Sequence, residues 1–218
     1  AASCWDIKQR NPEAADGAYW LQTPAMDHPA QFFCDQTTDG GGWVMIGRGR
    51  EGWESWSGGK GDPAKLTSRS RTSDDFDVVQ LSNKAVTELL NNEPVKDQAD
   101  GVRVMRSWSA SGSYYQTVDL QFPKMTDFVW PFKMAHPVNV QMDKGGWRSS
   151  LMWGLTGYDN EWNGLQTYPS ARTTGWKIGW GYGALTANWT GDVTSATSYF
   201  HKSGLTVFPY AEAYVRPH

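Results

Sequence analysis

The alternation of apolar and polar residues over the first part of the chain predicts short β-strands separated by turns. Runs rich in aromatic and apolar residues occupy positions 19–22, 31–34 and 43–46, and turn-forming residues bound them. Asp39 opens a glycine turn just before the third run. Residues 51–75 are rich in glycine, serine and charge, so we expect a loop there.

The clearest helical pattern falls at residues 76–92. Apolar residues recur there at every fourth position from Leu81 to Leu89, which places them on one helical face. Ser82 is suited to cap the amino-terminal end, and Pro94 is suited to end the segment. The pattern therefore predicts an amphipathic helix with one buried stripe.

Strands are predicted again further along the chain. Positions 101–106, 114–120 and 128–132 have the apolar and aromatic content of strands. A last strand is expected at 205–208, ahead of the segment 211–216. With glycine at about one residue in ten, such a chain is typical of a turn-rich β or α+β domain.

Regular periodicity fades beyond residue 140, and residues 143–200 contain few aliphatic side chains. A long irregular segment in a compact domain is usually functional or disordered. Dense aromatic residues argue for order, because they are normally buried or used for contact. We therefore expect an irregular, packed subdomain that carries the functional site. Its tryptophans are Trp147, Trp153, Trp162, Trp176, Trp180 and Trp189.

Composition narrows the class of protein. The chain has 218 residues and a formal net charge of -3, with 20% charged and 39% hydrophobic residues. This length and balance indicate one globular domain and exclude a coiled coil or a disordered tail. No apolar run is long enough to cross a membrane. The absence of a dense positive field argues against a nucleic-acid partner.

The two cysteines, Cys4 and Cys34, leave three alternatives open: inert thiols, part of a metal site, or a disulfide. A disulfide would close a loop of roughly 30 residues and contribute about 3 kcal/mol in the chain-entropy model. It would also indicate an oxidising compartment. The start at Ala1, without a charged or apolar leader, fits a mature secreted chain or an excised domain.

The short motifs give little support for catalysis. Residues 47–52 match G-x-G-x-x-G, but no helix pattern begins within them, as dinucleotide binding requires. No zinc-protease, nucleophile-elbow or C-x-x-C motif occurs. The acidic cluster Asp74, Asp75 and Asp77 is typical of a solvated helix start.

Residues 157–164 resemble a calcium-binding loop. Asp159 and Glu161 supply carboxylates, and two asparagines stand beside them. Ca²⁺ takes oxygen ligands from such side chains and from backbone carbonyls. The alternative is a polar turn that uses its Asp and Asn side chains for local hydrogen bonds.

A family resemblance rests on the first 50 residues. Phe33-Cys34-Asp35 is followed by three glycines and Trp43, and Cys4 and Tyr19 precede them in the expected order. This opening resembles that of fibrinogen-like domains, whose hallmark is an aromatic-Cys-Asp sequence followed by a Gly-Gly-Gly-Trp run. The last 20 residues match loosely, and the middle matches only in the order of its elements.

The resemblance implies an α+β fold with a mixed central β-sheet, short flanking helices and a loop-rich C-terminal subdomain. Cys4 and Cys34 would pair. One domain would comprise an N-terminal disulfide subdomain (1–50), the central sheet (51–140) and a binding subdomain with the closing strand (141–218). Relatives such as ficolins and tachylectins bind sugars, usually beside a calcium ion, fibrinogen binds a peptide, and the family is not enzymatic.

The chain departs from the family pattern in two ways. It lacks cysteines for the second disulfide, and the Asp-rich calcium loop is replaced at best by residues around Asp159. These departures leave the ligand open. They are typical of a divergent bacterial or invertebrate relative, or of a module cut from a larger secreted protein.

The leading hypothesis is a secreted, lectin-like module that recognises glycans through an aromatic-lined pocket. Indole and phenol rings suit the apolar faces of sugars, while amide and imidazole groups bond their hydroxyls. If the module binds Ca²⁺, the expected ligands are Asp159 and Glu161. The expected ligand-binding residues are Tyr158, Trp162, Asn163, Tyr168, Trp176, Trp180, Tyr182, Trp189 and His201.

Two alternatives stand beside it. The first is a structural module that binds a protein or peptide. The second is a secreted glycan-degrading enzyme that uses Asp159, Glu161 or Asp192. Because single sugar sites are weak, an oligomer or tandem array is expected for a lectin.

Overall fold

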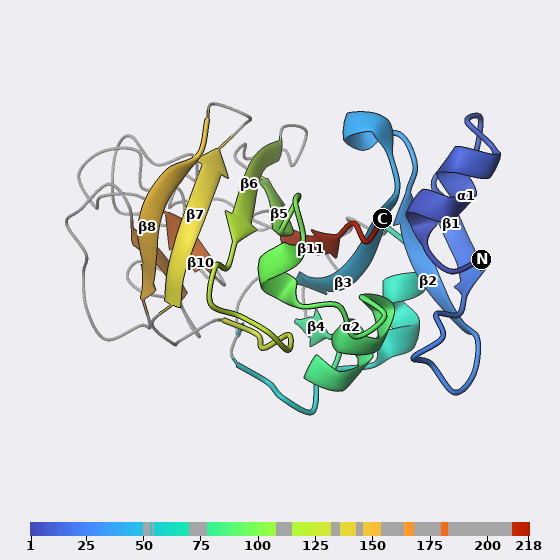
Figure 1. Cartoon of the computed structure of the whole chain (residues 1–218), viewed down its shortest axis with the longest axis horizontal. Helices are drawn as coiled ribbons and strands as arrows, with labels where there is room; N and C mark the ends of the chain where they lie inside the picture. Colours follow the sequence, from blue (N-terminus) through green and yellow to red (C-terminus); the bar gives the residue numbers. More distant parts are fainter. Residues whose placement is uncertain are drawn as a thin grey trace, which may run out of the picture.

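The fold is built on one long β-sheet (Figure 1). The computed structural model describes residues 1–49, 53, 55–69, 78–107, 115–131, 136–142, 146–153, 164–167, 180–182 and 211–218. Over these residues the sheet has 11 strands in the order β1-β2-β3-β11-β5-β6-β7-β8-β9-β10, with β4 paired to β3. The strands are β1 Gly17–Leu21, β2 Ala30–Asp35, β3 Trp43–Gly49, β4 Val79–Gln80, β5 Val102–Ser107, β6 Tyr115–Gln121, β7 His136–Met142, β8 Arg148–Trp153, β9 Gly164–Thr167, β10 Trp180–Tyr182 and β11 Ala211–Val215.

The sheet is mixed, as the sequence predicts. Neighbouring strands are antiparallel except β8 and β9, which are parallel. The last strand, β11, lies between β3 and β5 and so joins the amino-terminal and carboxyl-terminal parts of the chain. The strand expected at 205–208 falls outside the described residues.

Helices are short and lie beside the sheet (Figure 1). The α-helices are α1 Cys4–Arg10 and α2 Asn83–Leu89, and the 3₁₀ turns are η1 Thr38–Gly40, η2 Pro63–Thr67 and η4 Val95–Asp97. The sequence reading missed α1, whose seven residues are too few to show a helical period. Ser3 caps this helix by accepting a hydrogen bond from the backbone N–H of Asp6.

The disulfide between Cys4 and Cys34 is confirmed and attaches α1 to β2. Gln36 completes this junction, because its side-chain amide donates to the carbonyl of Cys4 and accepts from the N–H of Gly42. A Cβ at Gly42 would stand 2.7 Å from the Trp5 ring, and the backbone φ there is +82°. The Gly-Gly-Gly-Trp run thus lets the turn before β3 approach α1 closely.

The predicted helix at 76–92 is confirmed in part. Ser82 caps α2 as expected, and its hydroxyl accepts from the N–H of Ala85. The helix begins later than predicted, because Val79–Gln80 pair with β3 as strand β4 instead. A strand partner nearby therefore overrides the apolar period at the start of this segment.

The strand predicted at 128–132 is wrong over its described residues, which form no strand. Their apolar alternation reflects aromatic packing: Trp130 meets Phe128 edge-on at 5.1 Å and Trp53 at 6.1 Å between ring centroids. The Trp130 indole N–H donates to the carbonyl of Leu81. Gly47, from the G-x-G-x-x-G match, leaves room for these two indoles, since a Cβ there would stand 3.0 Å from Trp130.

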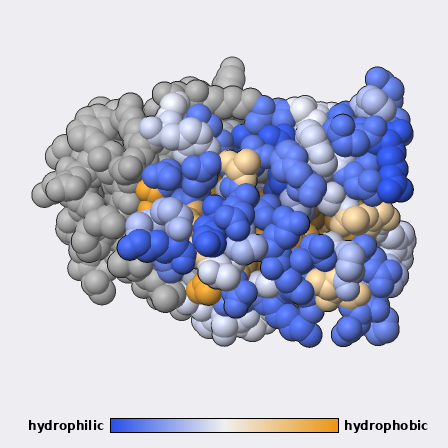
Figure 2. All heavy atoms as spheres, viewed as in Figure 1, coloured by the Kyte–Doolittle hydropathy of each residue, from blue (hydrophilic) through white to orange (hydrophobic). Residues whose placement is uncertain are grey.

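The region beyond residue 140 is less irregular than predicted, because β8, β9 and β10 fall within it. Short strands with few aliphatic residues escape a search for apolar alternation. The described face in Figure 2 is mainly hydrophilic, with small apolar areas. Among the described residues, no helix has the length and apolar content of a membrane span.

Candidate functional site

Most of the predicted binding residues lie outside the part of the chain that the structure describes. The exceptions are Trp180 and Tyr182, whose backbones lie on β10 opposite Thr167 and Leu165 of β9. Within the described ranges no group of three His, Cys, Asp or Glu side chains could hold a metal ion. The residues outside the description are Tyr158, Asp159, Glu161, Trp162, Asn163, Tyr168, Trp176, Trp189, Asp192 and His201.

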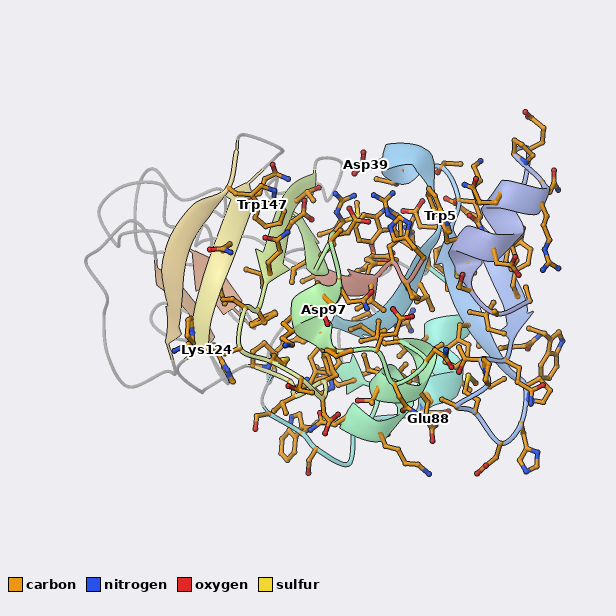
Figure 3. The ribbon with its side chains drawn as sticks, in the orientation of Figure 1. Trp5, Asp39, Glu88, Asp97, Lys124 and Trp147 are labelled. Carbon is orange, nitrogen blue, oxygen red and sulfur yellow. A yellow bond between two sulfur atoms is a disulfide. The ribbon has the colours of Figure 1, made fainter. Side chains whose placement is uncertain are left out.

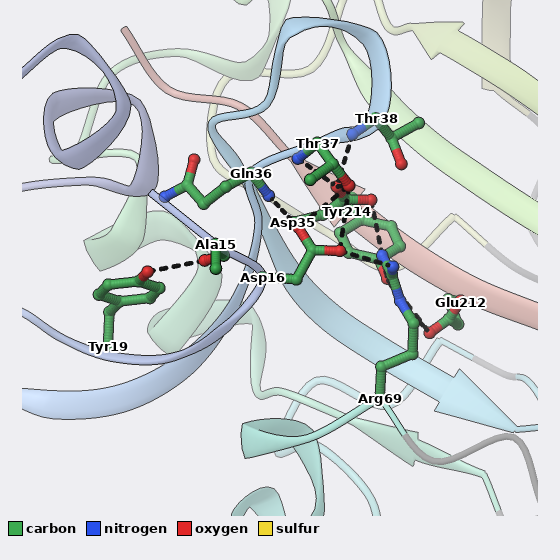
Figure 4. Close-up of polar contacts among 10 residues, drawn as sticks. All are labelled: Ala15, Asp16, Tyr19, Asp35, Gln36, Thr37, Thr38, Arg69, Glu212 and Tyr214. Atoms are coloured by element: carbon green, nitrogen blue, oxygen red, sulfur yellow. Dashed lines mark hydrogen bonds and ion pairs between the residues drawn. The ribbon is translucent and has the colours of Figure 1, made fainter. Parts of the chain in front are cut away.

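The described residues contain a first cluster of polar side chains around Arg69 (Figure 4). Its guanidinium lies 2.6 Å from a carboxylate oxygen of Asp35 and 3.3 Å from one of Asp16. It also donates to the phenol oxygen of Tyr214, which in turn donates to the buried carboxylate of Glu212. The cluster ties the ends of β1 and β2 to β11.

The charges of this cluster shift one another's pKa values. Burial alone would raise the pKa of Asp35, but hydrogen bonds from Thr38 and the Arg69 guanidinium hold it below its ordinary value of 3.8. Burial and the negative charge of Glu212 raise the pKa of the Tyr214 phenol well above 10.0. At neutral pH the Asp35 carboxylate is therefore ionised, whereas the Tyr214 phenol is neutral and donates a hydrogen bond.

A second cluster surrounds Arg103 on β5. Its guanidinium donates to both carboxylate oxygens of Asp119, at 2.7 and 3.1 Å, and these two residues are direct partners on β5 and β6. Asp39 accepts a further bond at 2.9 Å. The guanidinium also lies 4.0 Å from the centroid of the buried Trp43 ring. A bidentate, buried and stacked arginine of this kind fixes neighbouring strands.

A third cluster closes the carboxyl terminus. Arg216 lies 4.3 Å from the Trp43 ring and 2.8 Å from the carboxylate of Asp100. His218 reaches the same carboxylate at 2.9 Å and contacts the Trp5 ring. Burial alone would raise the pKa of Asp100, but its bonds with Arg216 and His218 lower it.

We call these three clusters the charged seam. Its members are Arg69, Arg103 and Arg216 with Asp16, Asp35, Asp39, Asp100, Asp119 and Glu212. Each arginine already has carboxylate partners and an aromatic neighbour. Figure 3 shows Trp5 and Asp39 over the β2–β3 end of the sheet. The seam holds the fold together and leaves little capacity to bind a ligand.

A groove of about 660 Å³ has a different character. Its walls come from β1 and β2, from the loop before η2, and from the start of α2. The lining is mostly apolar or uncharged. The lining residues are Trp20, Pro29, Ala30, Gln31, Phe32, Gly58, Gly59, Lys60, Gly61, Pro63, Ala64, Thr67, Gln80, Leu81, Ser82 and Ala85.

Trp20 is the most distinctive residue of the groove, because 60% of its surface is exposed. It points outward from β1, whereas the next residue, Leu21, enters the core. Gln31 on β2, its partner across the strand pair, also lines the groove, and the residue after it, Phe32, is buried. An exposed indole beside an apolar hollow is the arrangement found at the centre of protein-binding sites.

Sequence reasoning missed Trp20, although the strand pattern contains a signal for it. The predicted strand at 19–22 alternates, so an indole next to the inward-facing Leu21 must face outward. A large aromatic residue at an outward position of a strand is a candidate contact residue. The walls from residues 58–64 and 80–85, by contrast, reach the groove only through tertiary folding.

A smaller hollow of about 350 Å³ lies between α1 and the carboxyl terminus. Trp5 and His218 both line it, and their rings are in contact at 4.5 Å between centroids. Because its aromatic wall is already covered by the chain's own terminus, this hollow is a weaker candidate than the groove.

Comparison with known proteins finds relatives that match part of the chain. No family model matches it. Human tenascin-N is 38% identical over 65 residues, which are 26% of this chain and 5% of tenascin-N. Human angiopoietin-4 is 35% identical over 68 residues, which are 28% of this chain and 13% of angiopoietin-4. The chain thus spans only a small part of the relatives it matches.

Several solved structures are also similar to this chain. The fibrinogen-like globe domain of human ANGPTL2 gives a TM-score of 0.42 at 13% identity and covers 99% of this chain and 98% of its own. That of human ANGPTL6 gives 0.42 at 15% identity, covering 99% and 95%. A lamprey fibrin D-dimer complexed with the peptide Gly-His-Arg-Pro-amide gives 0.35 at 15% identity, covering 58% and 38%.

The chain is similar to fibrinogen-like proteins, the resemblance that its amino-terminal motif predicts. The Cys4–Cys34 disulfide and the glycine turn before Trp43 account for that motif physically. The mixed sheet with short helices is the fold that the resemblance implied.

Proposed function

We propose that this chain is a fibrinogen-like, extracellular protein-binding module that holds a segment of a partner protein in the groove. The observation that carries the proposal is Trp20, 60% exposed at the edge of an apolar groove of about 660 Å³. Large exposed apolar side chains are costly to display, and those beside a hollow usually mark a contact site.

The chemistry of the groove favours binding over catalysis. The lining residues within the described ranges include no carboxylate, histidine or cysteine that could act as a general base or a metal ligand. The disulfide supports an oxidising, extracellular setting for such a module.

A peptide selection tests this function directly. A phage-displayed library of linear 12-residue peptides is selected on the intact chain, and binders are synthesised and titrated by fluorescence anisotropy. Removing a central indole from a binding site costs about 2 kcal/mol or more, which is at least a 30-fold weaker Kd. We expect Trp20→Ala to show this loss.

Trp147 provides a matched control, because it is also exposed (41%) but does not line the groove. In Figure 3 it lies well apart from Trp5 and Asp39, near β6 and β7. Trp147→Ala should bind the peptides as the unaltered chain does. If the two substitutions weaken binding equally, or if no selected peptide depends on Trp20, the groove is not the binding site.

Carbohydrate binding is the second candidate function. It is favoured by the six tryptophans within residues 143–200, of which Trp147 is exposed. We propose that this segment, with Ca²⁺ on Asp159 and Glu161, would hold a glycan. A glycan array probed with and without Ca²⁺ tests this, and a blank array under both conditions would remove the candidate.

A further inference from the structure

The groove carries a second inference, which rests on the proposed function. We propose that it selects an extended peptide segment with an apolar residue next to a single carboxylate, and that Lys60 binds this carboxylate. Four features of the molecule support this proposal: the charge of the lining, the placement of Lys60, the loop around it, and the charge of the whole chain.

Among the lining residues that the structure describes, Lys60 is the one ionisable side chain. The remaining lining groups are apolar side chains, hydroxyls, amides and glycine backbone. A groove with one positive charge and no negative one is complementary to a segment with one negative charge. A basic segment would place its charge against Lys60 without compensation.

Lys60 is held in position from both ends. Its backbone exchanges two hydrogen bonds of 2.9 Å with Gln80, which fixes the loop to β4. Its ammonium group lies 4.4 Å from the centroid of the Trp56 ring. The ring attracts the ammonium but does not neutralise it, and no described carboxylate lies within ion-pair distance of it.

The loop that carries Lys60 favours an extended main chain over a bulky ligand. Gly59 and Gly61 let the loop backbone pack closely against residues 78–82, whereas Gly58 leaves the backbone uncovered ahead of the lysine. A Cβ at Gly58 would meet nothing within 4 Å. Strand β2 also lines the groove, with Trp20 of β1 beside it, and an extended peptide is the form that can lie along a strand.

The net charge limits how acidic the partner can be. The chain carries a formal charge of -3, so a polyanion would be repelled by the molecule as a whole. Only a local attraction at Lys60 remains. A single acidic residue or a chain-terminal carboxylate meets this condition, whereas sulfated glycans and nucleic acids do not.

The experiment uses the peptides selected above, each synthesised with its acidic residue and with the matching amide. We expect the acidic form to bind the unaltered chain about 5-fold tighter, which corresponds to about 1 kcal/mol for a partly exposed ion pair. This ratio of affinities should fall to one for Lys60→Gln. With Lys60→Glu the preference should invert, so that a peptide carrying Lys in place of the acidic residue binds more tightly than the acidic form. Added salt should reduce the ratio.

Lys65→Gln is the matched control, because Lys65 is an exposed lysine on η2 that does not line the groove. It should leave the ratio unchanged. If the ratio survives Lys60→Gln, or if selected peptides lack acidic residues, the inference about Lys60 fails while Trp20-dependent binding still supports the proposed function. If Trp20-dependent binding itself is absent, both fail.

Discussion

The charged seam and the groove each place a cation against a tryptophan, and they use this pair in opposite ways. Arg103 lies 4.0 Å from the Trp43 ring, is 3% exposed, and has Asp119 and Asp39 as partners. Lys60 lies 4.4 Å from the Trp56 ring on an exposed loop, with no described carboxylate within ion-pair distance. The comparison teaches that the carboxylates decide whether such a pair serves the fold or remains open to a partner.

The most severe test of this comparison is the substitution of Arg103, for which we expect the largest loss of stability. Arg103→Ala leaves the buried Asp119 carboxylate without its bidentate partner, which should lower the free energy of unfolding by about 3–5 kcal/mol. Urea unfolding followed by tryptophan fluorescence measures this loss. Lys60→Ala is the control and should change stability by less than about 0.5 kcal/mol.

A double substitution sharpens the result. Replacing Arg103 with Met and Asp119 with Leu removes both charges at once, so most of the lost stability should return. If Arg103→Ala costs no more than Lys60→Ala, the seam does not hold the strands together and the contrast with the groove is wrong.

The disulfide should give the next largest effect. Replacing Cys4 and Cys34 with Ser frees α1 from β2 and should cost about 3 kcal/mol, since the bond closes a loop with a sequence separation of 30. Thermal unfolding of the double variant, compared with the oxidised chain, measures this cost. The groove does not include the disulfide, so peptide affinity should be retained below the unfolding transition. A loss of affinity in the folded variant would contradict the separation of the two regions.

The amino-terminal fold could be predicted because its signals are local. Cys34 and the glycines before Trp43 stand in a short, ordered motif. Contacts within the first 50 residues explain Cys34, Gly41 and Gly42. Ser82 similarly caps α2 by bonding a residue three positions away. Such features are visible in sequence because cause and effect lie close together along the chain.

The rest depended on contacts that sequence spacing does not contain. Val79 and Gln80 became a strand because β3 is adjacent, and 128–131 did not because Trp130 packs against Trp53 and Leu81. The groove likewise combines Trp20 with Lys60, which are 40 positions apart. The predicted aromatic pocket lies outside the described residues, apart from the backbones of Trp180 and Tyr182, and stays a prediction.

Acid should produce the smallest effect, and it should act on the seam alone. The folded-state pKa values of Asp35 and Asp100 lie below the ordinary value of 3.8. Hydrogen bonds from Thr38 and Arg69 to Asp35, and from Arg216 and His218 to Asp100, outweigh the effect of burial. A lowered pKa contributes stability above 3.8 that is lost as the pH falls through the folded-state value. The urea midpoint should therefore decline below about pH 4.

Asp100→Asn distinguishes this origin from general acid unfolding. The variant should be less stable than the unaltered chain at pH 6, and its midpoint should fall less steeply between pH 4 and pH 2, because one titrating carboxylate is gone. Lys60→Gln should leave the slope unchanged, since the groove lining contains no carboxylate. Parallel pH profiles for Asp100→Asn and the unaltered chain would show that the seam's carboxylates do not set the acid dependence. A group that contributes nothing to proton uptake on unfolding cannot change the slope of stability against pH.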